Sequence, residues 1–332
     1  IRDSRQGERS EVLGEEDFRT PSPFEPFARP GTTEHTIEAV VGRETQPWLE
    51  EGEVTIVARA ERYAGPLASA DPVEQELTRP VLLRPPSLQV SSIQHYLKQG
   101  GSGAVRFVVG DTASRSGVVA GGVEALAHAF PGGAAGERFA LFGIPFDLAD
   151  ASSIRLFVED AAGNRAETPF VDIFDAQPPA HDSIDLPESF LQRVVPQIES
   201  HSPAVDASGS LLDRYLAING DLRAESRERV AELSRESRHE RLWEGAFGQL
   251  PNSQKMARYA ETRTYRYQGR SVDTQTHLGL DLASVRNAPV PAANRGIVLF
   301  ADYLGIYGNT VLVDHGYGLV SLYAHLSSIG VE

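Results

Sequence analysis

Apolar and polar residues alternate with the period of β-strands along most of this chain, and the pattern changes at a few places. Residues 1–33 are polar and rich in proline, and we interpret them as an extended arm or linker. Residues 34–85 and 86–178 contain short alternating runs, such as EVTIVARAERY and AVRFVVGD, with Gly, Asp and Asn between them. These runs predict two small β-sandwich modules, the second of them immunoglobulin-like.

Residues 179–240 have helical periodicity instead. ESFLQRVVPQI places four apolar residues on one stripe: Phe190, Leu191, Val194 and Val195. SLLDRYLAING ends on Asn219-Gly220, which predicts a helix stop before a second, charged helix. We expect these helices to form a connector to residues 241–332, where strand-like alternation returns. The predicted fold class is therefore multidomain and mainly β.

The composition limits the classes of partner. The chain has 332 residues, a formal net charge of −15 and a pI near 5.1, which argues against binding to nucleic acid or to an anionic membrane surface. The absence of cysteine excludes disulfides, thiolate zinc sites and cysteine nucleophiles. No apolar run approaches the roughly 18 residues of a membrane span. The sequence begins with Ile1 instead of Met, which is compatible with a preceding signal or anchor segment.

The stretch THLGLDLAS holds a histidine and an aspartate, His277 and Asp281, four residues apart. In a straight strand such residues share a face but lie about 13 Å apart, so they meet at one ion only if the chain bends. Gly279 between them permits that bend. The same spacing occurs in AHDSID, where we interpret His181 and Asp185 as linker residues before a helix. The spacing alone leaves a metal site and a polar strand end both open.

A second polar group occurs in HGYGLVSLYAHLSSI, which predicts a hairpin. Alternation places Ser321, Tyr323 and His325 on the less apolar face of its second strand. Taken alone, these residues could be functional groups or a solvent-facing set. We interpret the other histidines, including His315 beside the turn, as surface or capping residues.

Together these segments resemble a known family. RTYRYQG, THLGLDLAS, APVPAANRGIVLFA, YGNTVLVDHGYG and SLYAHLSSI follow one another as in lysostaphin/LytM-type zinc metallopeptidases, which cut peptide bonds in bacterial peptidoglycan. The resemblance covers residues 241–332 and implies an antiparallel β metallopeptidase domain there, incomplete at its C-terminal end.

The resemblance also implies roles for individual residues. His277 and Asp281 would be zinc ligands. His325 would face the metal without binding it and act on the attacking water or stabilise the oxyanion. Tyr323 would support the site or contact substrate, and Asn309 would be structural. The family's third ligand belongs to a His-x-His motif that this sequence does not contain up to Glu332. Either the sequence stops before that strand, which we expect, or this member has lost it.

The resemblance predicts a function in the bacterial cell envelope. We expect a Zn²⁺-dependent endopeptidase that hydrolyses peptide cross-links or stem peptides of peptidoglycan, in the periplasm or another extracytoplasmic compartment. Other envelope or divisome proteins are further candidate partners, and nucleic acid is not. The alternatives are a catalytically inactive relative that binds the wall or activates another hydrolase, and a β-rich adhesion protein. A His-x-His strand beyond Glu332 would favour the enzyme.

Overall fold

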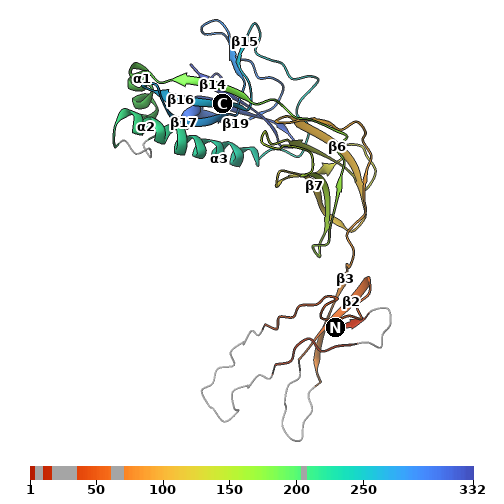
Figure 1. The fold of residues 1–332 in the computed structure, drawn as a ribbon. Coiled ribbons are helices and arrows are strands. Elements are labelled where there is room, and N and C mark those ends of the chain that lie inside the picture. The colour runs from red at the N-terminus through yellow and green to blue at the C-terminus, as the bar shows by residue number, and fades with distance from the viewer. Residues whose placement is uncertain (4–9, 17–35, 61–70, 203–207) are drawn as a thin grey trace, which may run out of the picture. The chain divides into compact units, whose positions relative to one another are not determined.

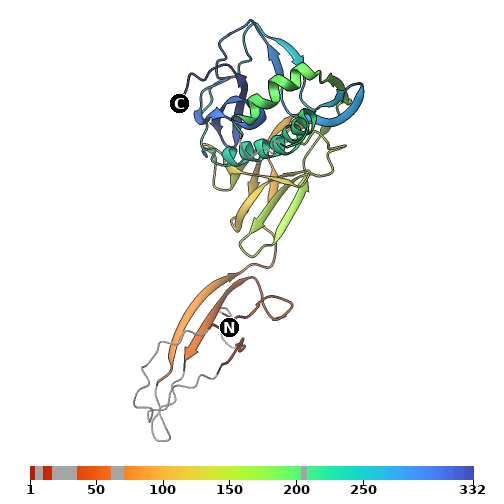
Figure 2. The same cartoon turned by 90° about the vertical axis from the view of Figure 1, so that its left-hand side faces the viewer.

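The computed structural model describes residues 1–3, 10–16, 36–60, 71–202 and 208–332. It is mainly β, as predicted, with a few helices (Figures 1 and 2). Its contacts divide the chain into two compact units. The first comprises Ile1–Ser87, Gly110–Arg115 and Val158–Ala166, and the second comprises Leu88–Val109, Ser116–Phe157 and Glu167–Glu332.

The first unit contains an antiparallel three-stranded sheet. Its strands, in spatial order, are β1 (Arg2–Asp3), β2 (Gly52–Ala60) and β3 (Val73–Val81). Ile1 is buried with Leu49 and Val54, so the first residue of the chain takes part in a small apolar cluster. The rest of the predicted arm, residues 4–9 and 17–33, lies outside the described residues.

The middle of the chain forms two four-stranded sheets. The first has the order β4 (Leu88–Val90), β6 (Ser102–Val109), β10 (Glu137–Gly143) and β9 (His128–Ala129). The second has the order β12 (Arg165–Pro169), β11 (Ile154–Asp160), β7 (Ala113–Ala120) and β8 (Val123–Leu126). Val105, Phe107 and Val109 are buried at alternate positions of β6, as expected for a strand with one face in a core. β5 (Tyr96–Lys98) and β13 (Ile173–Asp175) form a separate, parallel two-stranded sheet. The immunoglobulin-like arrangement of these strands stays a prediction.

A three-stranded sheet joins the connector to the C-terminal segment. Its order is β14 (Ala180–Asp185), β16 (Glu261–Tyr267) and β17 (Arg270–His277), with β14 parallel to β16. The interpretation of His181 and Asp185 as linker residues is therefore wrong, because both lie in a strand whose partner is about 80 residues further along the chain. The backbone hydrogen bonds of that distant strand stabilise an extended conformation that the local sequence does not indicate.

Three helical segments follow β14. They are α1 (Glu188–Glu199), α2 (Leu211–Ala217) and α3 (Arg223–Ser234). Ser210 begins α2 with a capping box, in which its hydroxyl accepts from the Asp213 backbone N–H and the Asp213 carboxylate accepts from the Ser210 backbone N–H. The predicted helix stop at Asn219-Gly220 is wrong, because residues Ile218–Leu222 form a π-helical turn that leads directly into α3. Asn219 is buried there and donates its side-chain amide to Asp273 at 2.6 Å, a tertiary contact that stabilises the turn.

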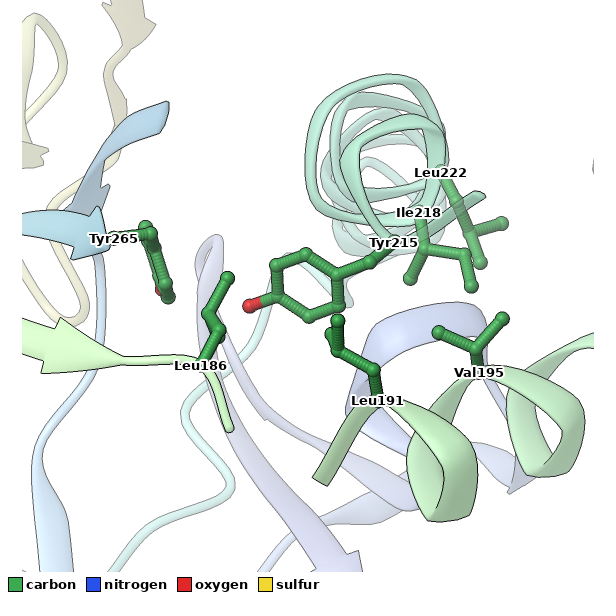
Figure 3. Close-up of a cluster of buried hydrophobic side chains, with 7 residues drawn as sticks. All are labelled: Leu186, Leu191, Val195, Tyr215, Ile218, Leu222 and Tyr265. Carbon is green, nitrogen blue, oxygen red and sulfur yellow. The ribbon is translucent and has the colours of Figure 1, made fainter. Parts of the chain in front are cut away.

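A buried cluster fixes the helices against the sheet. Its members come from α1, the α2–α3 region and the strands: Leu186, Leu191, Val195, Tyr215, Ile218, Leu222 and Tyr265. The Tyr215 ring points from α2 between Leu186 and Leu191, toward Tyr265 (Figure 3). The predicted apolar stripe of α1 is thus the packing face of that helix, and each fully buried aliphatic side chain contributes about 1.5–3 kcal/mol.

The remaining strands form two further sheets. One pairs β15 (Gln254–Ala257) with β18 (Asp281–Ala283), and the other orders β19 (Ile297–Tyr303), β20 (Asn309–Gly316) and β21 (Leu319–Leu326). The short helix η2 (Gly305–Tyr307) connects β19 to β20, and α3 packs against η2 and β19. Both views show α3 alongside these strands (Figures 1 and 2). Across the described residues, no helix has the length and apolar character to cross a membrane.

Candidate active site

His277 and Asp281 meet where the chain passes from one sheet to another. His277 ends β17, which pairs with β16, and Asp281 begins β18, which pairs with β15. The bend between these strands brings His277 Nε2 within 3.1 Å of Asp281 Oδ1. A Cβ at Gly279 would lie 3.3 Å from His277 Nε2, so glycine leaves room for the imidazole as it crosses the bend. The pair predicted from the sequence is therefore a pair in space.

Two neighbours orient these side chains. His277 Nδ1 lies 3.1 Å from the Arg258 carbonyl oxygen, which can only accept, so Nδ1 carries a proton and Nε2 is the nitrogen directed at Asp281. Arg263 on β16 donates to Asp281 Oδ2 at 2.7 Å. Partial burial acts to raise the pKa of Asp281, but the hydrogen bond from Arg263 and the neighbouring charges of His277 and Arg263 outweigh it. The pKa of Asp281 consequently lies below its ordinary value.

His325 lies near this pair, on β21. Burial lowers its pKa most, Arg223 and His277 lower it further, and the Asp281 carboxylate opposes them. The net effect lowers the pKa of His325 from its ordinary value, although the residue is exposed at the cavity surface. Its φ of 57° lies in the left-handed region, which few non-glycine residues adopt. His277, Asp281 and His325 line the same cavity, which has a volume of about 2210 Å³.

Tyr323 also lines the cavity, and its hydroxyl holds one wall in place. The Ala293 backbone N–H donates to the Tyr323 oxygen at 2.6 Å, and the hydroxyls of Tyr323 and Ser321 lie 2.9 Å apart. Ser321 also contacts His315 Nε2 at 2.8 Å, and His315 Nδ1 lies 2.7 Å from the Arg295 carbonyl oxygen. The chain of contacts therefore connects the strand β21 to the segment 293–295 at two points.

The Arg295 carbonyl can only accept, so His315 donates to it from Nδ1. Ser321 donates to the Tyr323 oxygen, which also accepts from the Ala293 N–H. His315 is fully buried, so its interpretation as a surface or capping residue is wrong. The signal for its burial is present in the sequence, since it ends the apolar run TVLVDHG.

The donor atoms fit part of a metal site. Two ligands of a tetrahedral zinc lie roughly 3.3 Å apart, close to the separation of His277 Nε2 and Asp281 Oδ1. His277 Nε2 and Asp281 Oδ1 are therefore the two atoms that would hold a metal ion here. Across the described residues, however, no three His, Asp or Glu side chains come together as a metal-binding cluster.

Comparison with known proteins is consistent with this geometry. Residues 275–332, which contain His277, Asp281, Tyr323 and His325, match Peptidase family M23. This segment is a peptidase M23 domain. The resemblance predicted from the sequence motifs is thereby confirmed for these residues.

The relatives of the M23 domain match over a short length. The DD-carboxypeptidase/endopeptidase Mpg of Neisseria meningitidis serogroup B and that of Neisseria gonorrhoeae are each 42% identical over 52 residues. The match covers 16% of this chain and 12% of each relative. A solved structure of a putative peptidase M23 from Pseudomonas aeruginosa is 18% identical, with a TM-score of 0.38 over 72% of this chain and 77% of that one. That TM-score is too low to support an argument.

Sequence motifs did not indicate two arginines that act on the site. Arg263 holds the Asp281 carboxylate, and Arg223 is close enough to lower the pKa of His325. Both lie outside the M23 match, in β16 and α3, and an arginine in an exposed-looking helix or strand has no distinguishing local pattern. Asn309 does have a structural contact, since its side-chain amide donates to the Leu326 carbonyl at 3.0 Å and joins β20 to the end of β21.

Proposed function

We propose that this protein is a zinc-dependent endopeptidase that hydrolyses peptides of bacterial peptidoglycan. The observation that carries the proposal is the convergence of His277, Asp281 and His325 on one cavity of an M23 domain. The curated relatives' name, DD-carboxypeptidase/endopeptidase, supports a peptidase activity of this class. Because its substrate would be the cell wall, we place the protein in the periplasm or another extracytoplasmic compartment of a bacterium.

In this proposal His277 Nε2 and Asp281 Oδ1 would hold the zinc ion. Zinc held there would supply a coordinated water of lowered pKa and would polarise the scissile carbonyl. Arg258 and Arg263 keep the two donor groups in place, through the Arg258 carbonyl and the Arg263 guanidinium. The His325 imidazole, whose pKa lies below its ordinary value, can accept a proton from the attacking water or donate a hydrogen bond to the developing oxyanion.

The experiment combines metal content with digestion of purified sacculi. We expect the full-length protein to contain about one zinc per chain by mass spectrometry and to release soluble muropeptides. The His277→Ala variant should lose both properties, because it removes a proposed ligand. His181→Ala is the matched control, since His181 precedes Asp185 with the same spacing but is exposed on β14.

The outcomes separate the enzyme from the inactive relative. Full hydrolysis of sacculi by the His277→Ala variant would contradict the assignment of His277 and its neighbours as the active site. Wild-type protein that neither binds zinc nor releases muropeptides, yet sediments with sacculi, would favour a wall-binding scaffold or hydrolase activator instead.

A further inference from the structure

The cavity that holds the candidate site is positively charged in a strongly acidic chain. The net charge of the chain is −15, but among the described residues that line the cavity Asp281 is the only acidic one. Four arginines line the same cavity: Arg223, Arg227, Arg263 and Arg295. Such a reversal of sign at one site favours an anionic ligand.

Two of the four arginines have carboxylate partners. Arg263 binds Asp281, and Arg295 forms an ion pair with Glu244. Arg223 donates instead to the backbone and side-chain oxygens of Asn219, a neutral residue that connects it to Asp273. This network fixes the Arg223 guanidinium without neutralising it by direct contact.

Arg227 has no carboxylate partner among the described residues. Its neighbours on the helix surface are Arg223, Ala224, Val230 and Ala231, at three and four positions away, so α3 offers it no acid at those positions. Two like charges at positions i and i+4 destabilise a helix, and this arrangement therefore has no structural benefit of its own.

The packing of α3 directs both arginines at the cavity. Arg223, Arg227 and Val230 lie at helical spacing on one face, and all three line the cavity. Ser226, on the neighbouring face, is buried against Gly305, where a Cβ would overlap the serine hydroxyl oxygen. Burial raises the pKa of Tyr307 in the cavity wall, and the nearby charges of Arg223 and Arg227 oppose that rise.

We propose that Arg223 and Arg227 form a carboxylate-binding subsite beside His325, and that the preferred substrate is a peptide with a free carboxylate close to the scissile bond. The guanidinium group suits this ligand because its planar donors pair with both oxygens of a carboxylate. This inference rests on the proposed peptidase function, because it names the class of peptide that the same cavity binds. The carboxylate belongs either to a side chain of the peptide or to its C-terminus.

Titration calorimetry on the full-length protein measures peptide binding. Zinc is removed first, so that the peptides are not hydrolysed during the titration. The probes are a cross-linked stem-peptide dimer with its side-chain and C-terminal carboxylates free, and two analogues in which one or the other is an amide. We expect one amidated analogue to bind about 10–100-fold more weakly than the free acid, as for the loss of a charge-assisted hydrogen bond. The analogue that loses affinity identifies which carboxylate is bound.

Arg227→Gln should remove this preference, with the free acid falling to the affinity of the weaker analogue. Arg229→Gln is the matched control, because Arg229 lies on the same helix, is exposed and pairs with Glu232. Equal affinity of wild-type protein for all three peptides, or no binding of any, would overturn the subsite. So would an Arg227→Gln variant that keeps the preference.

Hydrolysis with zinc restored separates this inference from the proposed function. Cleavage of all three peptides at equal rates would leave the peptidase intact and overturn the subsite. If the protein binds the free acid more tightly but cleaves none of the three peptides, the subsite is supported and the proposed endopeptidase activity is overturned.

Discussion

The candidate site depends on individual atoms whose directions are set by residues outside it. His277 presents Nε2 because its Nδ1 is held by the Arg258 carbonyl, and Asp281 presents Oδ1 because Arg263 holds Oδ2. The orienting groups lie on other segments, so replacing them would disturb the pair without removing either proposed ligand. At this scale the M23 segment supplies the side chains of the candidate site, and the neighbouring segments supply their geometry.

Tyr323 allows a test of how one hydroxyl positions the cavity wall. Tyr323→Phe removes the acceptor of the Ala293 N–H and the partner of Ser321. We expect the free energy of unfolding to fall by about 1 kcal/mol, since a typical hydrogen bond contributes that much. Hydrogen exchange of the Ala293 amide should become faster.

Tyr303→Phe is the control for this variant, because the Tyr303 ring stacks on His201 at 4.1 Å and that contact does not use the hydroxyl. Unchanged exchange at Ala293 in Tyr323→Phe would show that the bond does not hold the segment 293–295.

At the scale of elements, the helices pack against the C-terminal segment through one shared hydrophobic core. Leu191 and Val195 of α1 pack with Tyr215 of α2 and with Tyr265 of β16, the strand that also carries Arg263 (Figure 3). The π-helical turn at Ile218–Leu222 then continues the helix toward the cavity. The connector predicted from helical periodicity is therefore part of the packing that carries Arg223 and Arg227 to the site.

Leu191→Ala tests the contribution of this core. The leucine is fully buried, so its truncation leaves a cavity as well as lost transfer free energy. We expect the free energy of unfolding of this region to fall by about 2–5 kcal/mol in urea titrations. Gln192→Ala, at the exposed neighbouring position of the same helix, should change it by less than about 0.5 kcal/mol. Equal effects of the two substitutions would contradict the packing role of the stripe.

At the scale of the second unit, an aromatic cluster joins the sheet that contains β9 and β10 to the M23 domain. The ring centroid of His128, on β9, lies 5.0 Å from that of His239. It lies 4.8 Å from the ring centroid of Tyr317, which is in the turn between β20 and β21. Phe139 of β10 packs edge-on to Tyr317 at 4.8 Å. These contacts connect residues that are more than 100 positions apart in the chain.

The cluster predicts that stability depends on pH. Burial lowers the pKa of His128 below 6.5, and the neighbouring His239 lowers it further. Between that lowered pKa and 6.5 the unfolded chain binds more protons than the folded one, so acidification favours unfolding. We expect the melting temperature to be nearly constant above about pH 7.5, to fall as the pH drops below 6.5, and to level off once folded His128 also becomes protonated.

His128→Phe should reduce this slope while keeping the ring contacts, as thermal melts at several pH values would reveal. His181→Phe, at an exposed position of β14, should keep the wild-type slope. A slope that is the same in wild-type and His128→Phe protein would mean that His128 does not titrate in this way.

The sequence by itself determined the local features of this protein. The mainly β class, the apolar stripe of α1 and the M23 segment with His277, Asp281, Tyr323 and His325 all follow from periodicity or motifs within short windows. These features need only neighbouring residues, because the period of a strand or a helix is a local property.

The tertiary structure decided what depends on distant partners. The strand that contains His181 and the helix that continues through Asn219 each rest on hydrogen bonds with residues far along the chain. So does the direction of Arg223 and Arg227, because the packing of α3 against η2 and β19 turns this face of the helix toward the cavity. Backbone pairing and burial outweigh local preference at these positions, and no short window of sequence contains the partner that supplies them.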